Sequence, residues 1–220
     1  MAVLGALTVD VVSDVVCPWC YIGKRRLEAA LAKLREAEPD LPVHVRWHPF
    51  QLNPDLPPTG ADRRQYLEAK FGGPERAQQI YARVGAAGAT VGIQFAFDAI
   101  ERQPNTLDAH RLIAWAQARH EGDPDALVEQ LFRAYFLDGE YIGDHEELVR
   151  RAAAAGYDAD DARKFLASDE WKADVAASDH RAREMGVSGV PFFIFDGKTA
   201  VSGAHEPEAL LEAIAQARAA

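Results

Sequence analysis

The sequence lacks several features that would each indicate a particular class of protein. With only two cysteines, it cannot build the disulfide framework of a small secreted domain. No stretch approaches the ~20 consecutive apolar residues of a membrane span, and the first basic residue is Lys24, so a positively charged signal-peptide start is missing. Basic residues are also few: 24 against 34 acidic residues give a net charge of −10, which repels phosphate backbones and anionic lipid headgroups. We therefore expect a cytoplasmic protein whose partners include neither nucleic acid nor membranes.

The remaining composition is typical of a globular protein. The 220 residues allow one large domain or a compact two-part fold. Hydrophobic residues make up 48% and charged residues 26%, close to globular averages, which argues against disordered and fibrous classes. None of these quantities predicts an oligomeric state.

The two cysteines, Cys17 and Cys20, have the Cys-x-x-Cys spacing of a redox pair. Two structural roles compete with this interpretation. A disulfide that closes so short a loop would stabilise the protein by only about 2 kcal/mol on the chain-entropy model. A zinc site would need two more ligands, and the histidine pair at suitable spacing, His44 and His48, falls in a predicted strand, where its side chains would lie about 13 Å apart. We therefore favour the redox pair and predict no metal site.

The predicted elements place the cysteines at the start of a helix. Residues 7–16 are rich in β-branched residues and predict a buried strand, and apolar residues recur at helical spacing after Cys20. A second predicted strand at 43–47 completes a strand–helix–strand unit with a parallel pair. Amide groups and the dipole at the helix N-terminus favour a thiolate, so we expect Cys17 to be the nucleophile. Cys20, one turn later, would resolve the mixed disulfide.

The middle of the chain predicts helices, and its end returns to strands. Proline, glycine and aspartate mark the helix boundaries. The predicted helices cover 62–71, a segment from Pro74, 106–120, a segment from Asp123-Pro124, 144–156, a segment capped by Asp158 or Asp160, and 169–185. Strands at 191–195 and 199–201 flank Asp196-Gly197, which predicts a hairpin, and a last helix runs from about 206 to 218.

Three motifs follow one another along the chain: Ser13–Gly23 around Cys-Pro-Trp-Cys, Phe50–Pro54, and Gly189–Phe192. Together they resemble the DsbA-like thioredoxin-fold oxidoreductases, and most closely their FrnE-type branch. The resemblance implies an α/β thioredoxin fold with a large all-α helical insertion. It also implies a discontinuous thioredoxin-like domain formed by residues 1–60 and 181–220, with the helical insertion domain at 61–180.

The resemblance also implies roles for residues around the cysteines. The bond between Val190 and Pro191 is expected to be cis and to pack on the cysteines, and the backbone of Val190 is expected to pair with a bound peptide. Trp19 stands where strongly oxidising members have histidine, and we expect it to line an apolar substrate groove. Related isomerases and transferases have serine at the position of Cys17, so retention of both cysteines argues against their chemistry.

A few other residues invite functional interpretations. Asp14, three residues before Cys17, is a candidate proton relay during exchange. His110 could face the site from the insertion, but a histidine on an amphipathic helix more often marks the boundary of the core. Three consecutive basic residues, Lys24, Arg25 and Arg26, are interpreted as facing water.

These patterns predict a thiol–disulfide oxidoreductase that acts on protein or low-molecular-weight thiols. We expect no resident cofactor, with glutathione or another small thiol as candidate cosubstrate. Two alternatives stay open. One is a glutathione-dependent isomerase or transferase of the 2-hydroxychromene-2-carboxylate or kappa-class type, and the other is a thiol-bearing holdase that binds unfolded chains.

Overall fold

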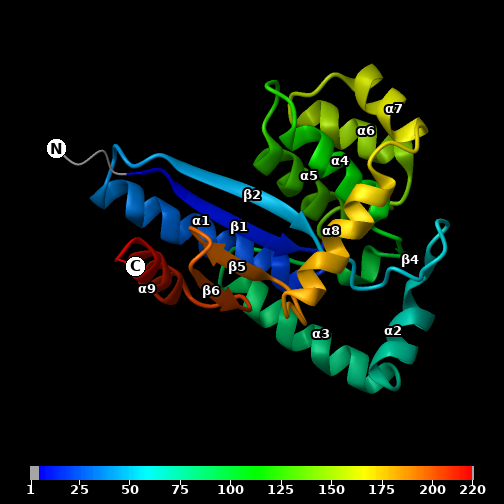
Figure 1. Ribbon diagram of the computed structural model, residues 1–220. Coiled ribbons are helices and arrows are strands. Elements are labelled where there is room, and N and C mark those ends of the chain that lie inside the picture. The colour runs from blue at the N-terminus through cyan, green and yellow to red at the C-terminus, as the bar shows by residue number, and fades with distance from the viewer. Residues whose placement is uncertain (1–4, 220) are drawn as a thin grey trace.

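A four-stranded mixed sheet organises the computed structural model, which describes residues 5–219 (Figure 1). The strands are β1 (Leu7–Ser13), β2 (Val43–Pro49), β5 (Phe192–Phe195) and β6 (Thr199–Ser202). Their order is β2-β1-β5-β6, with β1 parallel to β2 and antiparallel to β5. The parallel pair confirms the predicted strand–helix–strand unit, and the α/β fold with helices inserted between its strands is confirmed as well.

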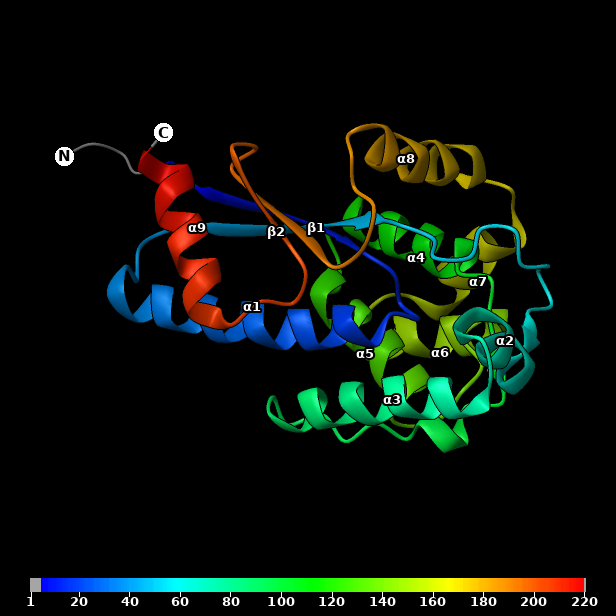
Figure 2. The same cartoon turned by 90° about the horizontal axis from the view of Figure 1, so that it is seen from below.

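Helices cover both faces of the sheet. α1 (Pro18–Ala37) and α9 (Pro207–Ala219) pack against each other on one face, while α8 (Lys172–Glu184) lies on the opposite side (Figure 2). Because β1 is central and covered on both sides, its valines are buried whichever way they point: Val9, Val11 and Val12 are all at most 2% exposed. This explains why apolar residues occupy both faces of β1 in the sequence and do not simply alternate with polar ones.

The helices between β2 and β5 begin where the capping residues predict. They are α2 (Arg63–Phe71), α3 (Pro74–Ala89), α4 (Leu107–Gln117), α5 (Pro124–Phe136), α6 (His145–Ala154) and α7 (Ala159–Ala167), followed by α8. The side chains of Asp62, Asp123, Asp144 and Asp158 each accept a hydrogen bond from an amide of the first turn. Of the two alternatives for α7, Asp158 is the cap. The predicted helix at 169–185 is shorter at its start, since α8 begins at Lys172.

Three short elements were not predicted. β3 (Ala61–Asp62) pairs with β4 (Arg102–Gln103), and η1 (Phe97–Ala99) is a single 3₁₀ turn. None of them is long enough to produce a periodic pattern. The predicted domain division at 60/61 and 180/181 stays a prediction, and α8 runs across the second position. No helix within residues 5–219 combines the length and apolar composition that a membrane crossing requires.

The inserted helices pack directly on the helix that carries the cysteines. Tyr21, the residue after Cys20, stacks on Phe132 of α5 with 4.9 Å between ring centroids. On the other side of the sheet, α4 meets β2 at its edge. The side-chain amide of Gln117 accepts from the Trp47 N–H at 2.7 Å and donates to the Trp47 carbonyl at 2.9 Å. These contacts fix α4 and α5 relative to the N-terminal turn of α1.

Candidate active site

Cys17 is the N-terminal cap of α1. Its φ of −95° and ψ of 111° are extended. Pro18 occupies the first helical turn, where the N–H that proline lacks would have had no partner within the helix. A tight turn holds the motif together: the Cys17 N–H donates to the Asp14 carbonyl and the Cys20 N–H to the Cys17 carbonyl, both at 3.0 Å. Both thiols are free, and the Cys17 sulfur lies 3.6 Å from the carbonyl oxygen of Val190.

The Val190-Pro191 segment packs on α1. The peptide bond between these residues is cis, as expected from the resemblance. A Cβ added to Gly23 would lie 2.8 Å from Cγ of Pro191 and 3.1 Å from Cζ of Phe193, closer than real Cβ contacts. The only interior glycine of the predicted helix therefore marks the place where the start of β5 approaches α1, and that approach brings Val190 to Cys17.

The two thiols occupy different environments. Cys20 is 1% exposed, and burial, followed by the neighbouring Cys17 thiol, raises its pKa well above the ordinary value of 9.0. The Ser13 side chain and the main chain of Asp14 oppose this rise in the pKa of Cys20. Cys17 is 5% exposed and lies at the tip of the helix, two residues before Trp19, which is 40% exposed. Both cysteines are therefore buried, Cys20 more fully than Cys17.

A buried carboxylate and a histidine lie behind the cysteines. The Asp14 side chain is fully buried, and its Oδ1 is 3.2 Å from Nε2 of His110. Its Oδ2 accepts a hydrogen bond from the Leu52 N–H at 2.8 Å. His110 is only 4% exposed, so its interpretation as a boundary residue is wrong: the helical insertion carries it into the interior.

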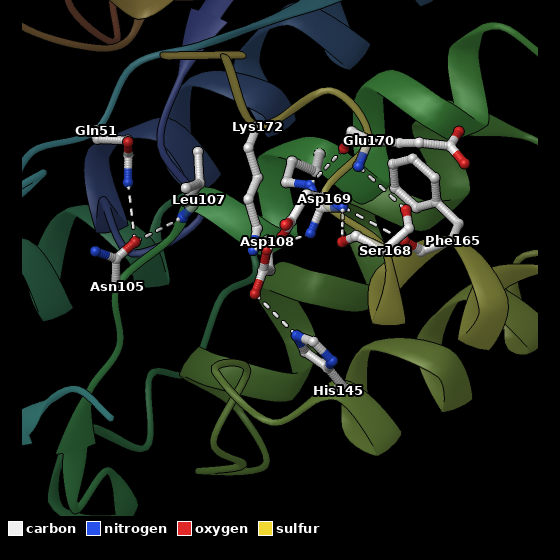
Figure 3. Close-up of polar contacts among 11 residues, drawn as sticks. Gln51, Asn105, Leu107, Asp108, His145, Phe165, Ser168, Asp169, Glu170 and Lys172 are labelled. Carbon is white, nitrogen blue, oxygen red and sulfur yellow. Dashed lines mark hydrogen bonds and ion pairs between the residues drawn. The ribbon is translucent and has the colours of Figure 1, made fainter. Parts of the chain in front are cut away.

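Polar contacts join the start of α4 to the loop after β2 (Figure 3). The side-chain oxygen of Asn105 accepts from the Leu107 N–H at 2.9 Å and from Nε2 of Gln51 at 3.1 Å. Gln51 belongs to the loop after β2, which also supplies the Leu52 amide to Asp14. Asp108, the second residue of α4, has its Oδ2 2.8 Å from Nε2 of His145 at the start of α6. The same loop thus holds both members of the Asp14–His110 pair.

Residues 8–215 match the family model described as DSBA-like thioredoxin domain. The chain belongs to this DsbA-like family. Assignment to its FrnE-type branch stays a prediction.

Solved structures agree with this membership. A probable DsbA oxidoreductase from Streptomyces coelicolor is 34% identical, with a TM-score of 0.84 over 96% of this chain and 89% of that one. A 2-hydroxychromene-2-carboxylate isomerase (19% identical, TM-score 0.66, 95% of each chain) shares the fold. So does the cytosolic disulfide reductase DsbM from Pseudomonas aeruginosa (20% identical, TM-score 0.61, 96% of this chain and 95% of that one). The DsbA-like fold thus carries both redox and isomerase activities.

The basic residues after Cys20 do not face water as predicted. Lys24 is 2% exposed, Arg26 is 12% exposed and Arg25 is 28% exposed. The carboxylate partners of Lys24 are Glu28, Asp125 and Glu129. Burial alone would lower the pKa of Lys24, but these carboxylates raise it above its ordinary value. The cluster joins α1 of the DsbA-like chain to α5 and has a structural role.

A buried arginine on the helical insertion is a residue that the sequence analysis missed. Arg63 is 3% exposed and donates to the hydroxyl oxygens of Tyr135 at 2.6 Å and Tyr81 at 3.0 Å. It forms no ion pair with a carboxylate within residues 5–219. Burial raises the pKa of Tyr81, Arg63 opposes the shift, and Cys17 adds to it, so Tyr81 lies within electrostatic reach of Cys17. An arginine at a helix start gives no sequence signal for such burial.

Within residues 5–219, the structure does not bring candidate metal ligands together into a site. Across the described range, 5–219, no three or more His, Cys, Asp or Glu side chains are placed to hold one ion. His48 lies instead 2.7 Å from Asp10 on the neighbouring strand. A groove of about 1100 Å³ along β2 and a hollow of about 850 Å³ between α2 and α3 contain neither cysteine in their walls.

Proposed function

We propose that this DsbA-like protein is a thiol–disulfide oxidoreductase that exchanges disulfides with protein or low-molecular-weight thiols. The observation that carries the proposal is the pair of free cysteines at the start of α1, with Cys17 at the helix tip beside the carbonyl of Val190 and Cys20 one turn further into the interior. In the reducing direction, the Cys17 thiolate attacks a substrate disulfide and forms a mixed disulfide. Cys20 then attacks the Cys17 sulfur, releases the second substrate thiol and closes the Cys17–Cys20 disulfide.

Three residues are proposed to bind substrate. The carbonyl of Val190, close to the Cys17 sulfur, can accept a hydrogen bond from an extended peptide once that peptide reaches the site. Pro191 holds this segment against α1 through its contact with Gly23. Trp19 offers an exposed apolar face beside the sulfur, and Met185, just before the Val190 segment, is 72% exposed. Asp14 is proposed as an acid–base group for the exchange.

The proposal includes a cytoplasmic location, no resident cofactor, and a small thiol as cosubstrate. Glutathione is the candidate because DsbM, which shares this fold, has been crystallised with it. A reducing compartment would also keep both cysteines as free thiols between reactions.

A trapping experiment tests the proposal. Cys20→Ser removes the resolving thiol, so we expect it to accumulate covalent, reductant-sensitive adducts with proteins or small thiols in a cell extract. Cys17→Ser and the double variant are the matched controls, and we expect almost no adducts from either. Mass spectrometry identifies the partners.

The same variants distinguish the two alternatives. An isomerase or transferase would turn over a small aromatic substrate with glutathione, would keep that activity after Cys20→Ser and would form no adducts. A holdase would suppress aggregation of unfolded chains equally well with both cysteines replaced. Either result, together with an absence of trapped partners, would overturn the redox proposal.

A further inference from the structure

A hollow of about 850 Å³ lies between α2 and α3, two neighbouring helices of the insertion (Figure 1). Its volume is within the roughly 300–1,000 Å³ that is typical of small-molecule sites. Neither Cys17 nor Cys20 lines it, and the exchange reaction proposed above uses none of its walls. The hollow is therefore a candidate ligand site that the proposed function leaves unexplained.

One wall of the hollow contains a buried cation that has no paired anion. Arg63 lines the hollow and is 3% exposed, and among residues 5–219 it forms no ion pair with a carboxylate. A charge that is removed from water is strongly destabilising unless an opposite charge pairs with it. The groups around Arg63 are neutral hydroxyls and an amide, which accept hydrogen bonds but carry no charge. A bound anion would supply the missing counter-charge.

The Arg63 guanidinium also has hydrogen-bond donors to spare. Nη1 donates to Oε1 of Gln103 at 2.7 Å and to the Tyr135 hydroxyl at 2.6 Å, whereas Nη2 donates once, to the Tyr81 hydroxyl at 3.0 Å. Nε is buried and has no partner in the part of the chain that the structure describes. Of the five N–H groups, one on Nε and one on Nη2 are thus left. Nε and Nη2 form one edge of the planar guanidinium, and such an edge binds a carboxylate through two hydrogen bonds.

The other walls favour a ligand with a flat apolar body. Tyr81, Phe95 and Phe97 line the hollow and are only half-buried. The Phe95 and Phe97 rings are stacked with 4.6 Å between centroids, and the Tyr81 ring meets Phe97 edge-on at 4.5 Å. Because the Tyr81 oxygen accepts from Arg63, its own proton is free to donate to a ligand. An aromatic surface thus lies next to the donors.

The rim of the hollow selects against highly charged anions. Glu75 and Asp98 are exposed at its walls, and Glu68 is paired with Arg64 at 3.0 Å. These carboxylates repel an anion in proportion to its charge, so a phosphate with two negative charges is disfavoured more than a monoanion.

We propose that the hollow between α2 and α3 binds a small aromatic monocarboxylate. Its carboxylate would pair with Arg63 and accept from the Tyr81 hydroxyl, and its ring would pack on Phe95 and Phe97. Because neither cysteine lines the hollow, the inference rests neither on the exchange reaction nor on the isomerase alternative.

A calorimetric titration of the full chain tests the site with three probes. They are 2-naphthoate, its neutral isostere 2-naphthamide, and inorganic phosphate as an anion without a ring. We expect saturable binding of naphthoate and roughly tenfold or greater weakening for the amide, because charge-assisted hydrogen bonds are about twice as strong as neutral ones. Phosphate should not displace naphthoate.

Three variants assign the binding to the residues named. Arg63→Gln should weaken naphthoate binding by roughly 10–100-fold and Tyr81→Phe by roughly 3–10-fold, as expected for the loss of a charged and a neutral partner. Binding of naphthamide to Arg63→Gln should be unchanged, which shows that the hollow is intact. The matched control is Arg64→Gln, because Arg64 lines the same hollow but is 87% exposed. Its affinity for naphthoate should stay within about twofold of the unsubstituted protein.

Several results would overturn the site: equal affinity for naphthoate and naphthamide, displacement of naphthoate by phosphate, or equal losses in Arg63→Gln and Arg64→Gln. If Arg63→Gln fails to fold, Tyr81→Phe and the preference of the unsubstituted protein for naphthoate over naphthamide decide. Replacement of both Cys17 and Cys20 by serine should leave naphthoate binding unchanged, and a loss of binding would contradict a site without the cysteines. A failure of the proposed exchange reaction is separate, since it would leave every one of these affinities as expected.

Discussion

The two sides of the cysteine pair are built from different parts of the chain and from different chemistry. We call the outer side the group Cys17, Trp19, Val190 and Pro191, and the inner side the group Cys20, Ser13, Asp14 and His110. The outer side combines the main-chain carbonyl of Val190 with the exposed side chain of Trp19 around a cysteine that is itself only 5% exposed. The inner side is buried and polar, with a thiol, a hydroxyl, a carboxylate and an imidazole. The two thiols should therefore react at different rates.

The largest expected difference between the sides is in thiol reactivity. Cys17 should react with iodoacetamide faster than Cys20 at neutral pH, because each unit by which burial raises the pKa of Cys20 lowers its thiolate fraction tenfold. Brief alkylation followed by peptide mass spectrometry measures both rates. Equal labelling, or preferential labelling of Cys20, would contradict the assignment of outer and inner cysteines.

A smaller effect is expected from filling the contact that supports the outer side. Gly23→Ala places a methyl group 2.8 Å from Pro191 Cγ, and overpacking of this kind costs about 1–3 kcal/mol. The gain of roughly 1 kcal/mol that alanine brings to a helix interior does not offset it. We expect a lower free energy of unfolding and slower attack by Cys17, since Val190 is displaced.

Gly85→Ala in α3 is the matched control, because nothing lies within 4 Å of its added Cβ. It should stabilise the protein by roughly 0.5–1 kcal/mol and leave exchange unchanged. Denaturant titration of both variants measures their free energies of unfolding. A stabilised Gly23→Ala would show that the segment before β5 moves without cost to accommodate the added methyl group.

The burial of Cys20 should make the free energy of unfolding fall as the pH becomes alkaline. The folded protein holds the Cys20 proton at pH values where the unfolded chain releases it, so this contribution is complete below pH 9.0 and is lost as pH rises toward the folded pKa. Above pH 9.0, the reduced protein should lose about 1.4 kcal/mol of stability per pH unit through Cys20. The comparison is with Cys20→Ser, whose stability should fall less steeply over the same range. Parallel curves for the two proteins would mean that Cys20 is not shielded.

The smallest effect on stability is expected from Trp19→Ala. The side chain is 40% exposed, so its loss should change the free energy of unfolding by no more than about 0.5 kcal/mol. Its effect should appear instead as a raised KM for peptide disulfides, with the rate toward a small disulfide unchanged. A large stability loss would place Trp19 among the packing residues rather than on the outer side.

Features set by neighbouring residues could be predicted from the sequence. The capping aspartates Asp62, Asp123 and Asp144 locate helix starts because a cap bonds to amides two or three residues away. The hairpin at Asp196-Gly197 follows from the positive φ angles that both residues adopt there. The outer side belongs to this class, since its residues lie within two short motifs.

Features that depend on distant packing could not be predicted. Asp14 and His110 are 96 residues apart and meet only because α4 is fixed to the loop after β2. From the sequence, Lys24 is predicted to face water. Its burial depends on the packing of α5, which brings Asp125 next to it. Arg63 likewise depends on tyrosines from two other helices. The contact between His110 and Asp14 belongs to this second class, although Cys20, Ser13 and Asp14 themselves lie in the Ser13–Gly23 motif.

The contact between Gln117 and Trp47 also affects how the molecule meets its neighbours. β2 is an edge strand, and the free main-chain groups of such a strand can template the strand of another molecule. The Gln117 amide bonds both the N–H and the carbonyl of Trp47, as a residue of an adjoining strand would. α4 thereby blocks intermolecular pairing at the end of β2 that lies beside the cysteine loop. An aggregating chain would have to nucleate at the opposite end, around Val43 and Val45, so edge-to-edge assembly is directed away from the reactive thiols.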